Sequence, residues 1–142
     1  MATVTSNYAN SVHTTRTESA VQVETILKWT YGLVPIVAGA DKFAHMLTDW
    51  DKYLAPIVTD ILPLSAGTFM AIVGIIEIVA GILVLIRPRI GSLVVGFWLI
   101  GIAINLLILG QYFDVAVRDV VMSIGAFSLF LLLRGERHTD RV

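Results

Sequence analysis

The residue best placed to do chemistry is Glu77, the single charged side chain in the apolar run of residues 69–86. About 20 apolar residues in a helix, at about 1.5 Å each, cross a hydrocarbon core of about 30 Å. A carboxyl group at that depth is costly unless it faces protein and finds a partner. Glu77 is therefore a candidate for proton transfer, for ligand binding, or for an ion pair that fixes how helices pack.

Other ionisable residues lie in the first and last apolar regions, at a similar depth. With a rise of about 1.5 Å per residue, they fall about 6–10 Å outward of Glu77, within reach of a long basic side chain. We predict one buried ionic cluster, made of Glu77, Arg118, Asp119, Asp41 and Lys42. Either Arg118 or Lys42 is expected to pair with Glu77. A packing role is favoured, and acid–base chemistry stays open.

Asp41 and His45 are four residues apart, so both side chains of a helix could face one metal ion. Such a site normally needs three or four ligands. The other histidines, His13 and His138, lie in the polar ends of the chain. We therefore expect no metal site, and interpret His45 as a hydrogen-bonded residue near the membrane surface.

An amide, Asn105, lies inside a third apolar stretch, on one helical face with Trp98 and Gly101. Amides in membrane spans usually bond across helices, which contributes about 0.6–2 kcal/mol. An amide can also bond the carbonyl oxygen of a quinone. Asn105 and His45 are thus the candidates for a quinone or interhelix contact, with packing favoured for Asn105.

These residues need helices to position them, and the sequence predicts four membrane spans. The first helix is expected from near Ser19 or Ala20 to about Leu47, with a kink at Pro35. The other spans are expected at about 66–86, 90–110 and 114–133. Residues 48–64 mix charges, aromatics and aliphatics, which indicates a short interfacial helix with Trp50 and Tyr53 at the membrane surface.

The predicted fold is thus all-α, an integral membrane four-helix up-down bundle with that interfacial helix between its first two helices. The domain boundaries are a polar tail at 1–19, the transmembrane domain at 20–134 and a second tail at 135–142. Basic residues concentrate on one side of the four spans: Arg16, Lys28, Arg87, Arg89, Arg134, Arg137 and Arg141. Only Lys42, Lys52 and Arg118 fall on the other side. The bias predicts that both termini are cytoplasmic.

Composition supports a membrane protein and excludes several classes. Apolar residues make up 56% of the chain and charged residues 15%, with a mean hydropathy of +0.81. There is no cysteine, which excludes disulfides and thiol redox chemistry. The net charge of -1 offers no basic footprint for nucleic acid. No phosphate loop, nucleophile elbow, haem attachment motif or dinucleotide fingerprint is present, so no cofactor is expected.

Several segments together resemble the DoxX-like family of small bacterial membrane proteins. They are YGLVPIVAGADKF, GIIEIVAGILVLI with its intramembrane glutamate, the basic turn RPRIG and the triplet VRD, and the likeness covers about residues 27–134. The resemblance implies a four-helix protein of the bacterial inner membrane. It also implies a likeness to the membrane subunit of thiosulfate:quinone oxidoreductase and to members implicated in redox homeostasis. The segment 48–64 and the N-terminal tail depart from the simplest members.

Small size, absence of a cofactor motif and polar ends favour an accessory or structural subunit of a larger inner-membrane complex of electron-transfer type, without catalytic activity of its own. Its expected partners are the lipid bilayer and other membrane subunits, or further copies of the chain, and no nucleic acid. The alternative is the membrane subunit of a quinone-linked oxidoreductase, in which the buried cluster handles protons.

Overall fold

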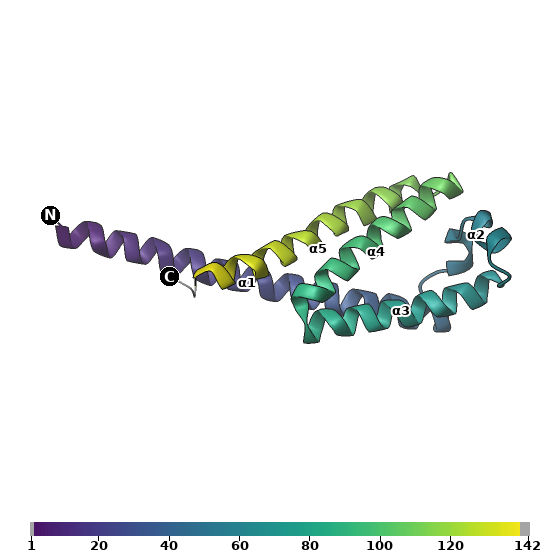
Figure 1. The fold of residues 1–142 in the computed structure, drawn as a ribbon, viewed down its shortest axis with the longest axis horizontal. Helices are drawn as coiled ribbons and strands as arrows, with labels where there is room; N and C mark the ends of the chain where they lie inside the picture. Colours follow the sequence, from purple (N-terminus) through teal and green to yellow (C-terminus); the bar gives the residue numbers. More distant parts are fainter. Residues whose placement is uncertain (1, 140–142) are drawn as a thin grey trace.

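The structure, a computed structural model, describes the backbone of residues 2–139 and the side chains of residues 18–134. Its elements, in chain order, are α1 (Ala2–Ala44), the 3₁₀ turn η1 (Trp50–Tyr53), α2 (Pro56–Ile61), α3 (Ala66–Ile86), α4 (Pro88–Leu109) and α5 (Phe113–Thr139). Figure 1 shows their arrangement. The prediction of an all-α protein is confirmed for the described residues, which contain no strand.

Helix α1 differs most from the expectation, because it begins at Ala2 rather than near residue 19 or 20. The chain from Ala2 to Tyr31 contains neither glycine nor proline, and a helix once nucleated propagates until a residue stops it. The backbone of the segment predicted as a tail, residues 1–19, is therefore helical from Ala2, in contrast to the predicted helix start near Ser19 or Ala20. The helix continues through Pro35 without a break and ends at Ala44, before His45, whose φ of 50° leaves the helical region.

The remaining long helices agree closely with the predicted spans. The Ser65 side chain caps α3 by accepting a hydrogen bond from the Thr68 amide, and Pro88 occupies the first turn of α4, where its missing N–H is harmless. Gly110 ends α4 with a left-handed φ of 72°. Helix α5 continues to Thr139, into the predicted tail at 135–142, and residues 140–142 lie outside the described part.

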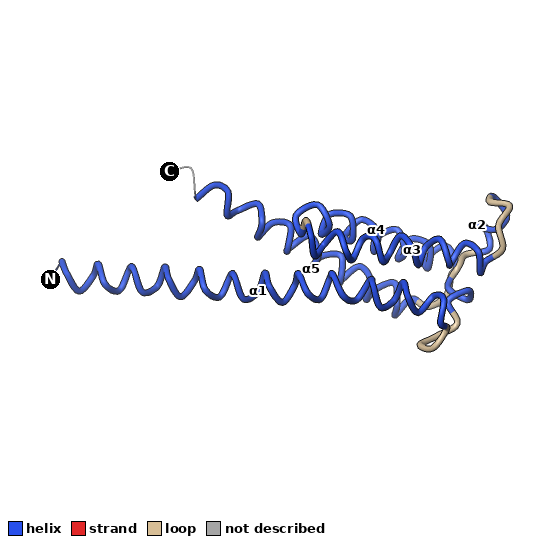
Figure 2. Tube along the Cα trace, turned by 90° about the horizontal axis from the view of Figure 1, so that it is seen from below, coloured by secondary structure: helices blue, strands red, loops and turns tan. Residues whose placement is uncertain are grey.

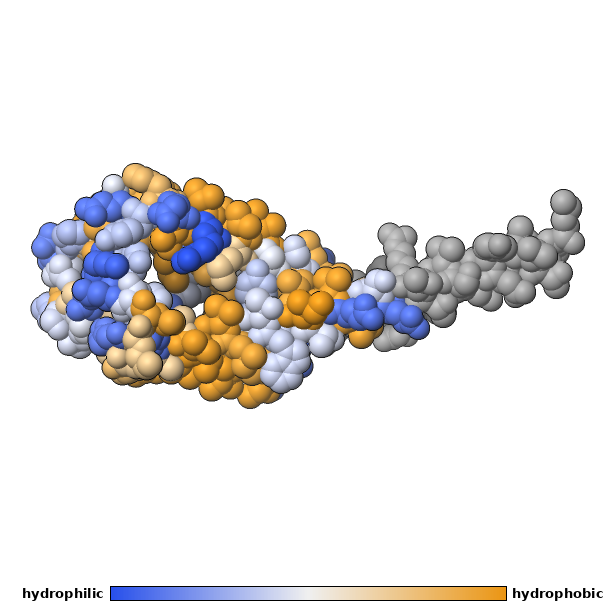
Figure 3. Space-filling model, turned by 180° about the vertical axis from the view of Figure 1, so that it is seen from behind, coloured by the Kyte–Doolittle hydropathy of each residue, from blue (hydrophilic) through white to orange (hydrophobic). Residues whose placement is uncertain are grey.

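Helices α3, α4 and the segment Phe113–Arg134 of α5 are long and apolar enough to cross a membrane, the three such helices in the described residues. Helix α1 does not qualify, since charges interrupt its apolar part. Figure 3 shows hydrophobic residues over the middle of one face, with hydrophilic residues gathered at the end that carries η1 and α2. These features favour a bilayer environment.

The closest packing joins α1 to α3 and α4 to α5, with smaller contacts between α3 and α4, between α1 and α5, and between α1 and α4. From their turn at Arg87, α3 and α4 diverge (Figure 1), and the η1 segment fills the space between their far ends. Leu54 packs with Met70 and Val73 of α3, while Tyr53 packs against α4 and α5. Figure 2 shows α1 beside the other helices along one side of this arrangement.

Glycines let α1 and α3 approach closely along their whole contact. A methyl group added at Gly74 would lie 2.7 Å from the carbonyl oxygen of Gly39, and one added at Gly39 would strike the carbonyl of Gly74. Gly32 and Gly81 form a second such pair, because a methyl group at Gly81 would strike the Gly32 carbonyl. We call these four residues the glycine seam. Small residues at such contacts allow dense backbone packing.

Candidate functional site

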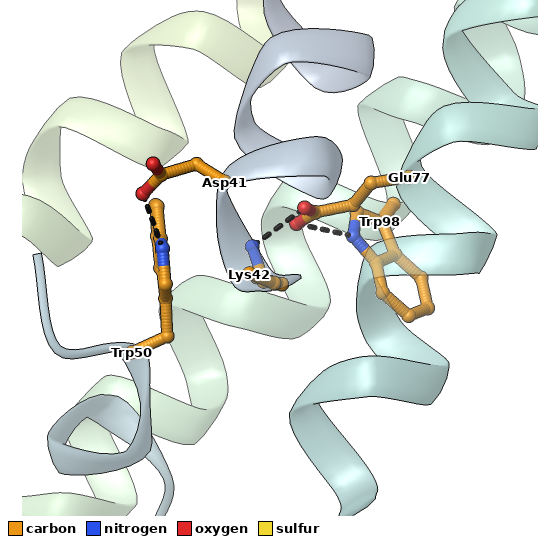
Figure 4. Close-up of polar contacts among 5 residues, drawn as sticks. All are labelled: Asp41, Lys42, Trp50, Glu77 and Trp98. Atoms are coloured by element: carbon orange, nitrogen blue, oxygen red, sulfur yellow. Dashed lines mark hydrogen bonds and ion pairs between the residues drawn. The ribbon is translucent and has the colours of Figure 1, made fainter. Parts of the chain in front are cut away.

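The centre of the site is an ion pair between Lys42 of α1 and Glu77 of α3. The Lys42 Nζ and Glu77 Oε2 atoms are 2.6 Å apart, and the two side chains are only 4% and 8% exposed. The glycine seam brings the helices together next to this pair, since Lys42 Cβ lies close to Gly74. Helical side chains lean toward the N-terminus, which directs Lys42 back along α1 to the level of Glu77. Figure 4 shows the pair.

Two tryptophans lie on either side of the ion pair (Figure 4). The ring of Trp50 covers the Lys42 ammonium, with 3.8 Å between Nζ and the ring centre. The Trp98 indole nitrogen lies 3.5 Å from Glu77 Oε1, at the far limit of a hydrogen bond. A cation over a desolvated indole face gains about 2 kcal/mol. Lys42 is therefore held between a carboxylate and an aromatic face.

Asp41 is buried beside Lys42 but faces a different set of donors. It accepts a hydrogen bond of 2.8 Å from Trp50 Nε1 and others of 3.0–3.1 Å from the backbone amides of Met46 and Leu47. These bonds fasten η1 to the end of α1. Both carboxylate oxygens of Asp41 thus accept hydrogen bonds, and a metal ion could bind Asp41 only by displacing these donors.

His45 does not contribute to this site. Its side chain is exposed, and only its backbone amide bonds to the Asp41 carbonyl oxygen, at 2.7 Å. No group of three or more metal-ligating residues occurs among the described residues. His13 and His138 lie outside the described side chains. Among the described side chains, no hydrogen bond or ion pair links the His45 side chain to another helix.

Asp119 and Arg118 differ in burial, although both were predicted to belong to the buried cluster. Asp119 is buried and interacts electrostatically with Glu77 and Lys42. The Arg118 side chain is 66% exposed and its Nε is 3.9 Å from Asp119 Oδ1. Neighbouring helical residues point about 100° apart, and with Asp119 facing the cluster the Arg118 side chain points away from it. The prediction that Arg118 is buried was wrong, and Lys42 is the partner of Glu77.

Asn105 ties the η1 segment to α4. Its side-chain oxygen accepts from the Ala55 amide at 3.1 Å, and its side-chain nitrogen donates to the Tyr53 carbonyl at 2.7 Å. Both ends of the amide are therefore bonded to backbone. This agrees with the packing interpretation, although the partner is a loop segment rather than a helix.

The site also contains residues whose roles the sequence did not indicate. Trp50, which was expected to anchor the interfacial segment, bonds Asp41 and covers Lys42. Tyr31 links α1 to α5 by donating to the Met122 carbonyl at 2.7 Å. The two seam glycines of α1, Gly32 and Gly39, are seven residues apart, as are Gly74 and Gly81 of α3, and this shared spacing was a readable signal for the α1–α3 contact. No comparable local sequence pattern predicts the contacts of Trp50 with Asp41 and Lys42.

Comparison with protein-family models, with curated proteins and with solved structures found no match to this chain. Its function has to be argued from the arrangement of its own residues.

Proposed function

We propose that this chain is a DoxX-like integral protein of the bacterial inner membrane, and that it serves as an accessory subunit of a larger complex of electron-transfer type. In this proposal α1, α3, α4 and α5 form an up-down four-helix bundle with both termini in the cytoplasm. Helix α2 lies at the outer surface, an assignment supported by the exposed Ile57 and Ile61.

The observation that carries the proposal is the length of α1. Among the described side chains, Leu27 is the first of α1 that packs on the hydrophobic core, whereas the helix begins at Ala2. At about 1.5 Å per residue, the preceding part is about 38 Å long. In Figure 1 the N-terminal portion of α1 extends beyond the ends of the other helices. Helical stability comes mostly from tertiary packing, so a long projecting helix suits a chain that docks on another subunit.

The ion pair also favours this role over catalysis. Lys42 and Glu77 are in direct contact, enclosed by Trp50 and Trp98, and glycines close the helices around them. A buried charge pair that satisfies itself fixes helix register, as polar groups in apolar interfaces often do. Such a pair gives a small membrane subunit one defined surface to present to its neighbours.

Removal of residues 2–19 is expected to abolish association with partner subunits while the rest of the protein stays folded. The reason is that this segment lies ahead of the part of α1 that packs on the core. Purification from native membranes, followed by native mass spectrometry, measures association for both forms. Helical content and melting temperature serve as the fold control. A full-length chain that always runs as a lone monomer would remove the accessory-subunit proposal.

A second candidate function, the membrane subunit of a quinone-linked oxidoreductase, is favoured by Asp119. Its side chain is buried, interacts electrostatically with Lys42 and Glu77, and has its one ion pair among the described side chains with the exposed Arg118, at 3.9 Å. A buried carboxylate held by such a long contact is suited to accept a proton.

In that case Asp119→Asn is expected to lower quinone turnover at least about 100-fold, because general acid–base catalysis contributes about that much or more. Quinone reduction in membranes that carry the variant chain measures the effect. Asp114→Asn, the same change at an exposed carboxylate of α5, is the matched control. Full turnover in Asp119→Asn membranes would rule this candidate out.

A further inference from the structure

Three arginines lie together at the end of the packed helices opposite to η1 and α2. Arg87 forms the turn between α3 and α4, and Arg89 is in the first turn of α4. The Arg89 guanidinium lies 5.8 Å from the ring centre of Phe130, which is one helical turn before Arg134 on α5. We call Arg87, Arg89 and Arg134 the arginine patch.

The arginine patch carries positive charge that the described residues do not neutralise. The ion pairs found among the described side chains are Lys42–Glu77 and Arg118–Asp119, and neither includes a patch arginine. Arg87 and Arg134 are exposed, and Arg89 is half-buried. The start of α4 adds to this charge, since Arg87 provides no side-chain cap and a helix N-terminus has a positive partial charge.

Apolar residues next to the arginine patch indicate what kind of anion it meets. Ile86 and Ile90 flank the turn and are 71% and 50% exposed. Trp29 of α1 is exposed near the same end, as is typical of aromatic residues at the headgroup level. A free anion in water gains nothing from exposed isoleucines, whereas a phospholipid places acyl chains directly beside its phosphate. This combination favours a lipid.

We infer that the arginine patch binds the phosphate headgroup of an anionic phospholipid, whose acyl chains lie along Ile86 and Ile90. Guanidinium groups match phosphate oxygens with paired hydrogen bonds, which lysines do not. Basic groups between membrane helices on the cytoplasmic side are known to suit such headgroups. The inference rests on the membrane orientation given in the proposed function, but not on the accessory-subunit role.

The test uses the purified full chain in nanodiscs of phosphatidylcholine with increasing phosphatidylglycerol or cardiolipin. Native mass spectrometry counts retained lipids, and the melting temperature is followed in parallel. The wild type is expected to retain anionic lipid at least about tenfold better than phosphatidylcholine, since each basic residue near a membrane surface adds to the attraction for anionic lipid. The triple variant Arg87→Gln, Arg89→Gln, Arg134→Gln is expected to lose this preference.

Single variants provide a charge-matched comparison. Arg89→Gln is expected to weaken retention of anionic lipid, while Lys52→Gln, which removes one exposed positive charge at the opposite end, is expected to leave it unchanged. Equal losses in both would show a general charge effect and overturn the inference, as would a wild type without lipid preference. Displacement of the lipid by millimolar inorganic phosphate would point to a free-anion site instead. Because no partner subunit is present, the result is independent of the association test.

Discussion

Replacement of Lys42 by methionine is expected to lower the free energy of unfolding by about 3–5 kcal/mol, because it leaves the Glu77 carboxylate buried without a cation. The loss should be large here since both side chains are almost fully enclosed and Trp98 offers only a long contact of 3.5 Å to the same carboxylate. Equilibrium unfolding in mixed micelles of increasing denaturing detergent measures the change.

The double variant Lys42→Met with Glu77→Met separates a missing charge from missing packing. An apolar pair of similar volume removes both buried charges at once, so stability should return to within about 1–2 kcal/mol of the wild type. The exposed Arg118→Gln serves as a reference for loss of a charge without burial. If Lys42→Met and the double variant are equally unstable, the ion pair does not hold α1 to α3 in the way the contact suggests.

The second large effect is expected from Gly39→Val and Gly74→Val. Each would drive a side chain into the carbonyl group of the facing helix, which cannot move aside as a flexible side chain would. Overpacking of this kind costs up to about 3 kcal/mol and here also separates Lys42 from Glu77. Melting temperature and the same detergent titration measure the loss for each variant.

Gly101→Val is the matched control, because a methyl group there meets nothing within 4 Å. It carries the same change in helix propensity as the two seam variants. A seam variant as stable as Gly101→Val would mean that α1 and α3 are not packed backbone to backbone. A crosslinking experiment across the seam would then be expected to show a larger spacing.

The long apolar spans were predictable because their signal is local. The expected span at about 66–86 coincides with α3, where an apolar run follows a serine cap and precedes a proline. The burial of Glu77 followed from the same run, since a carboxylate in such a helix has to face protein. Lys42 was one of its two expected partners, and the choice between Lys42 and Arg118 depended on whether Arg118 or Asp119 of α5 faces inward.

The parts that were not predictable depend on packing between distant segments. The rotation of α5 about its axis determines that Asp119, and not Arg118, faces the other helices. The pattern of apolar residues in α5 gives little information about this rotation. The position of Trp50 depends on where the chain turns after His45, and its bond to Asp41 spans a loop. The early start of α1 was not predicted because residues 1–19 are rich in Ser and Thr, which are weak helix formers, although this segment contains no glycine or proline.

The continuity of α1 has a mechanical consequence. A helix of 43 residues is about 64 Å long, roughly twice the thickness of a hydrocarbon core. Helices bend only gently unless a specific residue breaks their hydrogen bonds. The glycine seam holds α1 against α3 at a point between Lys42 and the projecting N-terminal stretch. Because the helix is continuous, a tilt of the N-terminal stretch would also displace the end of α1 that carries Lys42.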